Sequence, residues 1–156
     1  MATDLQTTGS RSVTQSPELA LPERLRGALE KIQSVKDLPP CGPNTRAMIA
    51  ASIVQYERAS AGSSIHEVER LLTAMASAWP SSKISDAEAN ARLELFGPAL
   101  ADIPVDILKS ALQDAVRTCT FFPSVKEIRD LAAPLKSRRA WELMALKYWA
   151  EKSDRA

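Results

Sequence analysis

The sequence predicts an all-α protein, a compact bundle of about seven short helices behind a disordered N-terminal arm. Three observations lead to this fold class. Between residues 22 and 152, apolar residues recur at steps of three and four, which is the spacing of one helix face. The helix-starting pattern S-x-x-E, a capping box, occurs at Ser64, Ser85 and Ser124. No segment alternates apolar and polar residues as a half-buried strand does, and the five glycines leave little for hairpin turns.

The first 43 residues predict an arm, one helix and a connector. Residues 1–16 are rich in Thr, Ser and Gln and carry few large apolar side chains, so burial cannot offset the entropy of ordering them. A helix is expected within residues 17–38, opening near Pro22, because proline suits the first helical turn and apolar residues follow at helical spacing. Residues 39–43 contain three prolines and a glycine and form the expected connector.

Residues 44–134 are predicted to form a helical core domain, followed by a C-terminal Trp-rich helix within residues 135–156. The first core helix is expected from Asn44 or Thr45 to about residue 59. Pro80 and Pro134 are expected to end helices, because the residue before a proline is pushed out of the α region. The remaining core helices are expected to open at Ser64, Ser85, Pro104 and Ser124.

Composition and charge set limits on function. The formal net charge is +1, so no field of the whole chain attracts nucleic acid or membrane. Residues 84–116 hold six acids and two bases, a local charge of −4, whereas residues 126–156 hold eight bases and five acids, a local charge of +3. Cys41 and Cys119 lack a metal-ligand spacing, so neither a zinc site nor a disulfide framework is expected. No apolar run is long enough to span a membrane, and a cytoplasmic protein is expected.

The sequence offers little material for catalysis, and we expect neither an enzyme nor a bound cofactor or metal. His66 is the only histidine, and its place in a first helical turn indicates a surface residue. Residues 42–46 lack the glycine spacing and the lysine of a phosphate-binding loop. The acids of residues 84–116 mostly stand at helix starts, where the helix dipole favours a carboxylate. Phe122 is expected in the core, whereas for Phe121 packing and an exposed docking role stay open.

The last helix is the strongest candidate for a binding surface, because its apolar groups lie on nearly every side and alternate with cations. It could pack over the core with its cations at the edge, dock on a partner protein, or stack on single-stranded nucleic acid. The residues that we expect to bind a partner are Arg138, Arg139, Trp141, Met144, Lys147, Tyr148 and Trp149.

Three stretches between Leu71 and Ala132 resemble the helicase loader and inhibitor proteins of tailed phages: LLTAMASAWP, LADIPVDILKSA and FFPSVKEIR. The resemblance covers roughly 60 residues, and its motifs mark helix boundaries. In that family a small helical protein without ATPase activity binds the replicative helicase, holds it inactive and helps to deliver it to an origin complex. The family uses a flexible tail for helicase contact, and here residues 138–149 are the candidate replacement. The residues that match the family pattern are Trp79, Pro80, Asp102, Pro104, Phe122, Pro123 and Ser124, and Glu127 completes the capping box of Ser124.

The function expected from these observations is that of a non-enzymatic phage DNA-replication protein that binds a replicative DNA helicase and regulates or loads it. Such a protein would work in the host cytoplasm. Two alternatives remain open at this stage. The first is a replication or regulatory protein that binds single-stranded nucleic acid through the cations and rings of the last helix. The second is a phage-encoded inhibitor of a host protein–nucleic acid complex, whose acidic residues 84–116 imitate nucleic acid. Exposed apolar helices could also pair in a homodimer.

Overall fold

The computed structural model describes residues 19–79 and 84–156, and in these ranges it is all-α, without a strand. The predicted fold class is therefore confirmed. Neither the predicted arm at residues 1–16 nor Pro80 lies within the described residues. No helix of the described part is long and apolar enough to cross a membrane. Its helices are α1 (Glu23–Glu30), α2 (Pro43–Ala59), α3 (Ile65–Ala76), α4 (Asp86–Leu100), α5 (Val105–Thr118) and α6 (Val125–Asp154), with a short 3₁₀ turn, η1 (Val35–Asp37).

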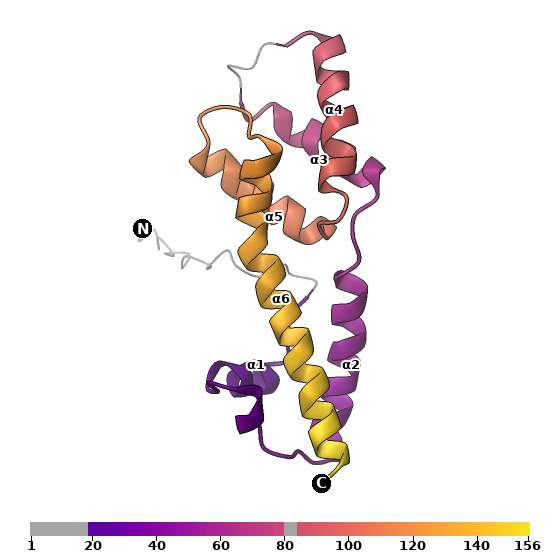
Figure 1. The fold of residues 1–156 in the computed structure, drawn as a ribbon, viewed down its shortest axis with the longest axis vertical. Coiled ribbons are helices and arrows are strands. Elements are labelled where there is room, and N and C mark those ends of the chain that lie inside the picture. The colour runs from indigo at the N-terminus through magenta and orange to yellow at the C-terminus, as the bar shows by residue number, and fades with distance from the viewer. Residues whose placement is uncertain (1–18, 80–83) are drawn as a thin grey trace, which may run out of the picture.

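The longest helix, α6, runs the length of the molecule, and the other helices are arranged along it (Figure 1). The prediction that Pro134 separates two helices was wrong, because α6 continues through it. A proline inside a helix removes one hydrogen bond, here to the carbonyl of Asp130. Pro134 and Asp130 are both exposed, so water can reach the carbonyl that loses its partner. Both halves of α6 are packed into apolar clusters, which holds them in line.

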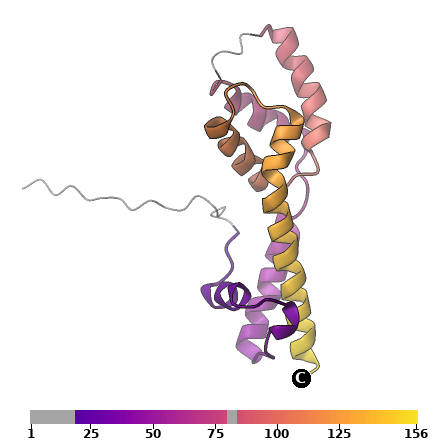
Figure 2. The ribbon, with the colours of Figure 1, turned by 60° about the vertical axis from the view of Figure 1, so that its left-hand side comes forward.

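The helices enclose two apolar clusters, one around each half of α6 (Figures 1 and 2). The upper cluster, as Figure 1 is oriented, is formed by α3, α4, α5 and the first half of α6; the lower cluster is formed by α1, η1, α2 and the second half of α6. The predicted core domain of residues 44–134 is thus divided, because α2 packs in the lower cluster. Fully buried members of the upper cluster include Val68, Leu100, Leu108, Leu112 and Ile128, and those of the lower cluster include Leu25, Leu38, Ile49 and Leu146.

The three predicted capping boxes are confirmed. At the start of α3 the Glu67 backbone N–H donates to Ser64 Oγ at 3.1 Å, and the Ser64 N–H donates to Glu67 Oε2 at 2.8 Å. Ser85 and Ser124 open α4 and α6 in the same way. The hydrogen bonds from Ser64 also lower the pKa of Glu67, because they favour its charged form. Reciprocal local bonds of this kind explain why the sequence located these helix starts.

The N-terminal segment differs from its prediction in length. Instead of one helix over residues 17–38, α1 ends at Glu30 and the 3₁₀ turn η1 follows, opened by a further capping box between Ser34 and Asp37. Helix α2 begins at Pro43, with Gly42 as its N-cap, rather than at Asn44 or Thr45. Thr45 is instead buried, on the side of α2 that faces the lower cluster.

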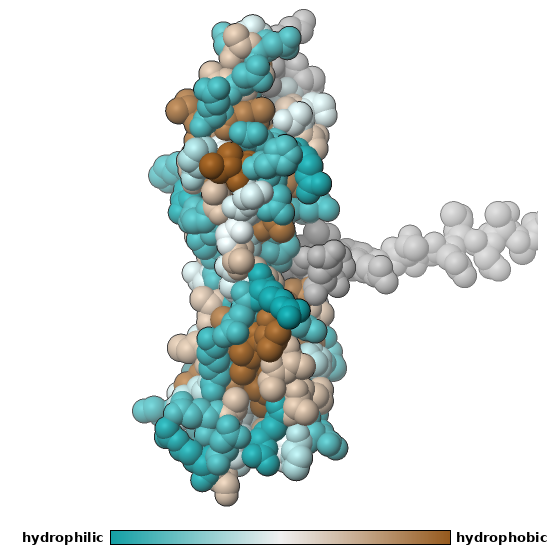
Figure 3. Space-filling model, turned by 90° about the vertical axis from the view of Figure 1, so that its right-hand side faces the viewer, coloured by the Kyte–Doolittle hydropathy of each residue, from teal (hydrophilic) through white to brown (hydrophobic). Residues whose placement is uncertain are grey.

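The outward side of α2 is mixed in character. Figure 3 shows apolar side chains gathered over the lower half of the molecule, on the side where α2 lies. The exposed residues of α2 include three alanines and Val54, which is 47% exposed. They also include the polar or charged residues Asn44, Gln55, Glu57 and Arg58.

Candidate protein-binding surface

The structure divides the predicted binding residues of α6 between the interior and the surface. Trp149 is only 3% exposed, and its indole N–H donates to the carbonyl oxygen of Pro39 at 2.7 Å. It holds the connector after η1 against the lower cluster. The prediction that Trp149 contacts a partner was therefore wrong, because its ring is in the core and its only polar atom is already bonded.

The predicted cations of this helix are engaged within the protein. Arg138 Nε donates to Glu142 Oε1 at 2.9 Å, and Lys147 Nζ lies 2.8 Å from Glu57 Oε1 on α2. Arg139 is largely buried and contacts α2 and α5, so it serves the fold rather than a surface. The nucleic-acid hypothesis requires a row of unpaired cations along α6. The three predicted cations instead contact carboxylates of the same chain.

Three of the four predicted apolar or aromatic residues remain at the surface, on one side of α6, while the paired cations Arg138 and Lys147 are also exposed. Trp141 is 39% exposed, Met144 is 50% exposed, and Tyr148 is partly exposed. Positions three and seven residues apart lie on one side of a helix, so these side chains adjoin. We call Trp141, Met144 and Tyr148 the α6 face. Large apolar groups on a helix anchored at both ends are suited to binding a partner, because little conformational entropy is lost when they do so.

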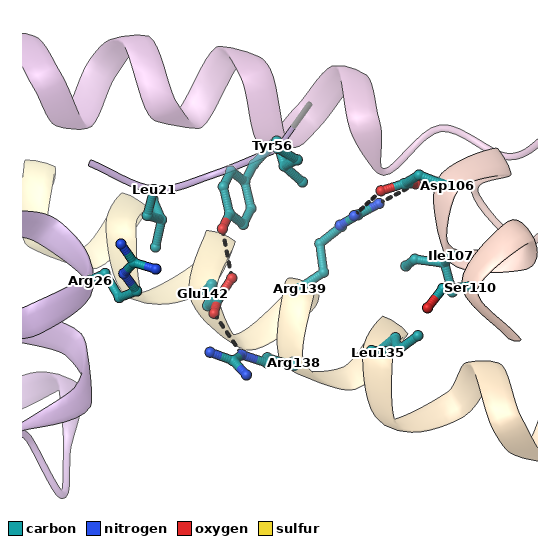
Figure 4. A pocket seen from close by; sticks show the side chains of 11 residues that line it. Leu21, Arg26, Tyr56, Asp106, Ile107, Ser110, Leu135, Arg138, Arg139 and Glu142 are labelled. Carbon is teal, nitrogen blue, oxygen red and sulfur yellow. Dashed lines mark hydrogen bonds and ion pairs between the residues drawn. The ribbon is translucent and has the colours of Figure 1, made fainter. Parts of the chain in front are cut away.

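Polar side chains from α2, α5 and α6 converge where the two clusters meet, a region that we call the junction (Figure 4). Arg139 Nη1 donates to Asp106 Oδ1 at 2.9 Å, Arg139 Nη2 bonds the other carboxylate oxygen, and Nη1 also donates to the carbonyl oxygen of Ala59 at 2.8 Å. Beside them, Tyr56 Oη donates to Glu142 Oε2 at 2.6 Å. A cavity of about 80 Å³ lies between these groups.

The surroundings of Asp106 and Tyr56 in the junction shift the pKa of each group away from neutral pH. Burial would raise the pKa of Asp106, but the hydrogen bonds and charge of Arg139 outweigh burial and hold it below its usual value. Burial and the neighbouring Glu142 carboxylate raise the pKa of Tyr56 well above that of a free tyrosine. Asp106 is therefore charged and Tyr56 neutral at neutral pH. No sequence pattern indicated this site, because the residues that bond across it are 33 to 86 positions apart.

The residues that carry the family resemblance have structural roles in the upper cluster. The Trp79 indole N–H donates to the carbonyl oxygen of Cys119 at 3.0 Å, and its ring lies 5.3 Å from that of Phe122. Pro104 precedes α5, and Pro123 is buried beside the capping box of Ser124 and Glu127. These contacts join the end of α3 to the turn between α5 and α6.

Asp102, another of these residues, accepts hydrogen bonds from Nη1 and Nη2 of Arg129, at 2.6 and 2.9 Å, and from Lys136 Nζ at 3.1 Å. Arg129, and then Lys136, hold the pKa of Asp102 far below its usual range. Asp102 and Asp106 are thus both neutralised by cations of α6. The acidic surface expected over residues 84–116 is weaker than the sequence suggests.

The two most exposed large apolar side chains of the described residues lie on the upper half, apart from the α6 face. Phe122 packs against the upper cluster, whereas the adjacent Phe121 is 71% exposed, which answers the question that the sequence left open. Leu95 on α4 is 72% exposed and was not singled out by the sequence pattern, because it lies off the apolar stripe of its helix. His66 is exposed, and the described residues contain no group of His, Cys, Asp or Glu suited to a metal ion.

Comparison of the chain with models of protein families, with curated proteins and with solved structures finds no match in any of the three. The fold and the surfaces described above are therefore the observations from which function has to be argued.

Proposed function

We propose that this protein is a non-enzymatic binding protein that docks on a partner protein through the α6 face. The observation that carries the proposal is the exposure of Trp141 and Met144 on a helix fixed by apolar clusters at both ends. Interface centres are enriched in Trp, Tyr and Met, and such rings lose little rotamer entropy on binding. Helix α6 thus supplies a preorganised surface of the right chemistry.

For the partner, we propose a replicative DNA helicase that this protein regulates or loads. The support is the resemblance of the segments between Leu71 and Ala132 to phage helicase loaders and inhibitors, together with the α6 face at the place where that family has its helicase-binding tail. The phage origin and the replication role belong to the same proposal.

The two alternative functions have less support from the geometry. For single-stranded nucleic acid, Trp149 is buried, and Arg138, Arg139 and Lys147 already contact carboxylates. For imitation of nucleic acid, Asp102 and Asp106 are paired with cations. A protein partner requires neither free cations nor an acidic field, and the α6 face provides apolar rings.

The experiment is a quantitative binding assay of the full chain with the replicative helicase of the same host. We expect micromolar or tighter binding, weakened at least about tenfold by Trp141→Ala and by Met144→Ala, because each removes an apolar group from the centre of the interface. Leu95→Ala is the control, since it removes an even more exposed apolar side chain from another helix. Absence of binding at micromolar concentrations would refute the helicase as partner. Equal loss in all three variants would refute the α6 face.

The same variants distinguish a protein partner from the alternative partner, single-stranded nucleic acid. Binding of single-stranded DNA that weakens steeply with salt and with Trp141→Ala would favour that function over a protein partner. The Trp149→Ala variant is unsuitable for this test, because it disturbs the core.

A further inference from the structure

The two halves of the protein have separate apolar cores and meet at a polar stretch of α6. Apolar side chains of α6 pack in the upper cluster as far as Leu135 and in the lower cluster from Leu143 onward. Among the described residues, none of positions 136–142 belongs to either cluster. Polar groups of the junction occupy this stretch instead, among them Arg139 and Glu142 (Figure 4). Two units with separate cores are expected to move relative to each other unless a large apolar interface joins them.

Within the described residues, the chain crosses between the halves at two places that lie side by side. One crossing is α6, and the other is the linker of residues 60–64 between α2 and α3. The two are adjacent, because Arg139 of α6 donates to the carbonyl oxygen of Ala59, the last residue of α2. The far end of the linker is fixed to the upper half, where the hydroxyl and N–H of Ser63 donate to the carbonyl oxygen of Ile103 at 2.6 and 3.2 Å. Crossings at one level allow one half to rotate against the other, whereas crossings at different levels would oppose rotation.

Both crossings bend more easily than the helices of the clusters. In α6, Pro134 removes the backbone hydrogen bond to the carbonyl of Asp130, and proline is a common cause of a helix kink. Pro134 and the preceding Ala133 are exposed, so a bend at that point moves neither of them out of a core. The linker lies outside the helices, so no helical hydrogen bonds hold it straight.

Space between the halves leaves room for such a bend. The cavity of about 80 Å³ at the junction is lined by Tyr56 of the lower half and by Ile107 of the upper half. An open cleft of about 420 Å³ lies between Gln55 and Arg58, near the end of α2, and Val105, at the start of α5. Because residues of both halves line both spaces, the halves are not closely packed there, and the angle between them can change without a clash.

One side chain fastens the two halves at the angle that the structure shows. Arg139 belongs to the second half of α6, and its guanidinium bonds both carboxylate oxygens of Asp106 in the upper half and the carbonyl oxygen of Ala59 in the lower half. A two-bond pair of this kind requires one relative orientation of its partners. Arg139 lies about 8 Å beyond Pro134 along the helix, so a bend of about 20° would move it by about 3 Å and break the bonds to Asp106.

We propose that α6 is a hinge at Pro134 and that the bonds of Arg139 to Asp106 and Ala59 are the latch that holds it straight. Loss of the latch lets the lower half swing relative to the upper half while each cluster stays intact. The α6 face moves as one unit, because all of its residues lie beyond the hinge. The protein can therefore present this face at different angles to its upper half. The proposal does not depend on the helicase or on any other partner.

The experiment is double electron–electron resonance of the full chain, with spin labels on cysteines introduced at exposed positions. Cys41→Ser and Cys119→Ser remove the two native thiols. The pair across the hinge is Leu95→Cys in the upper half and Glu151→Cys near the end of α6. Glu151 lies about 25 Å beyond Pro134 along the helix, so a bend of about 20° displaces its label by roughly 9 Å.

The latch predicts one narrow distribution of distances across the hinge in the protein with its native Arg139. Arg139→Met should add a second population, at least about 5 Å from the first, because the hinge is then free to bend. Pro134→Ala together with Arg139→Met should remove most of that population, since alanine restores the helical hydrogen bond at the hinge.

Two label pairs within single halves are the matched controls. Leu95→Cys with Lys126→Cys reports on the upper half, and Val54→Cys with Glu151→Cys reports on the lower half. Both distances should stay unchanged in Arg139→Met, which shows that each half keeps its fold. The same distribution across the hinge with and without Arg139→Met would overturn the proposal. So would a change in a control pair as large as that across the hinge, or a second population that persists in full with Pro134→Ala.

Discussion

Replacing Arg139 by methionine tests whether the junction holds the two halves of the protein together. The substitution keeps a long side chain but removes both hydrogen bonds to Asp106 and the one to the carbonyl oxygen of Ala59. Both charged side chains are mostly buried, with 11% of Arg139 and 18% of Asp106 exposed. Breaking a fully buried pair costs 3–5 kcal/mol, and partial access of water lowers that cost, so we expect Arg139→Met to lose about 3 kcal/mol.

The assay is urea unfolding followed by circular dichroism at pH 7, with the free energy of unfolding compared between variants. Lys126→Met is the matched control on the same helix, because its ion pair with Asp130 is exposed, and we expect little change from it. Removing both partners, in Arg139→Met with Asp106→Leu, should cost less than Arg139→Met alone, since no unpaired carboxylate is left buried. A loss in Arg139→Met no greater than that in Lys126→Met would refute a stabilising role for the junction.

The pH dependence of this loss has a definite sign. The pKa of Asp106 is lower in the folded protein than in the unfolded chain, so folding favours the charged carboxylate. Its contribution is complete above the unfolded value of about 4 and is lost as the pH falls through the folded value. The difference in unfolding free energy between wild type and Arg139→Met should therefore be constant from about pH 6 to 8 and shrink in acid. A difference that grows below pH 4 would contradict this assignment.

Five further substitutions follow from the fold. Trp149→Ala should cost about 4 kcal/mol in urea unfolding, because it empties a buried site, whereas Trp141→Ala should cost less than about 1 kcal/mol. Gly62→Ala should lower the melting temperature, because its Cβ would lie 2.5 Å from a backbone carbonyl oxygen; Gly27→Ala in α1 meets open space and should stabilise by about 0.5–1 kcal/mol. Pro134→Ala should stabilise the protein by about 2 kcal/mol, since it restores a hydrogen bond within α6, and an unchanged or lower stability would contradict a continuous helix there.

The parts of the fold that the sequence predicted are those that depend on neighbours along the chain. Ser64, Ser85 and Ser124 open helices by bonding residues three positions away, so four consecutive residues contain the whole interaction. The buried stripe of α5 follows from periodicity in the same way. For α6 the presence of Pro134 was a misleading signal of a helix end. The free energy lost with one backbone hydrogen bond is small compared with that gained by packing both halves of the helix.

The candidate site depended on contacts that no local pattern contains. Trp149 and Trp141 look alike in sequence, and only the position of η1 and the connector decides that one is covered and the other is not. Arg139 and Arg138 are adjacent, yet one faces α5 and the other stands at the surface, because successive residues of a helix point about 100° apart. Which side of α6 is free is therefore a property of the tertiary fold.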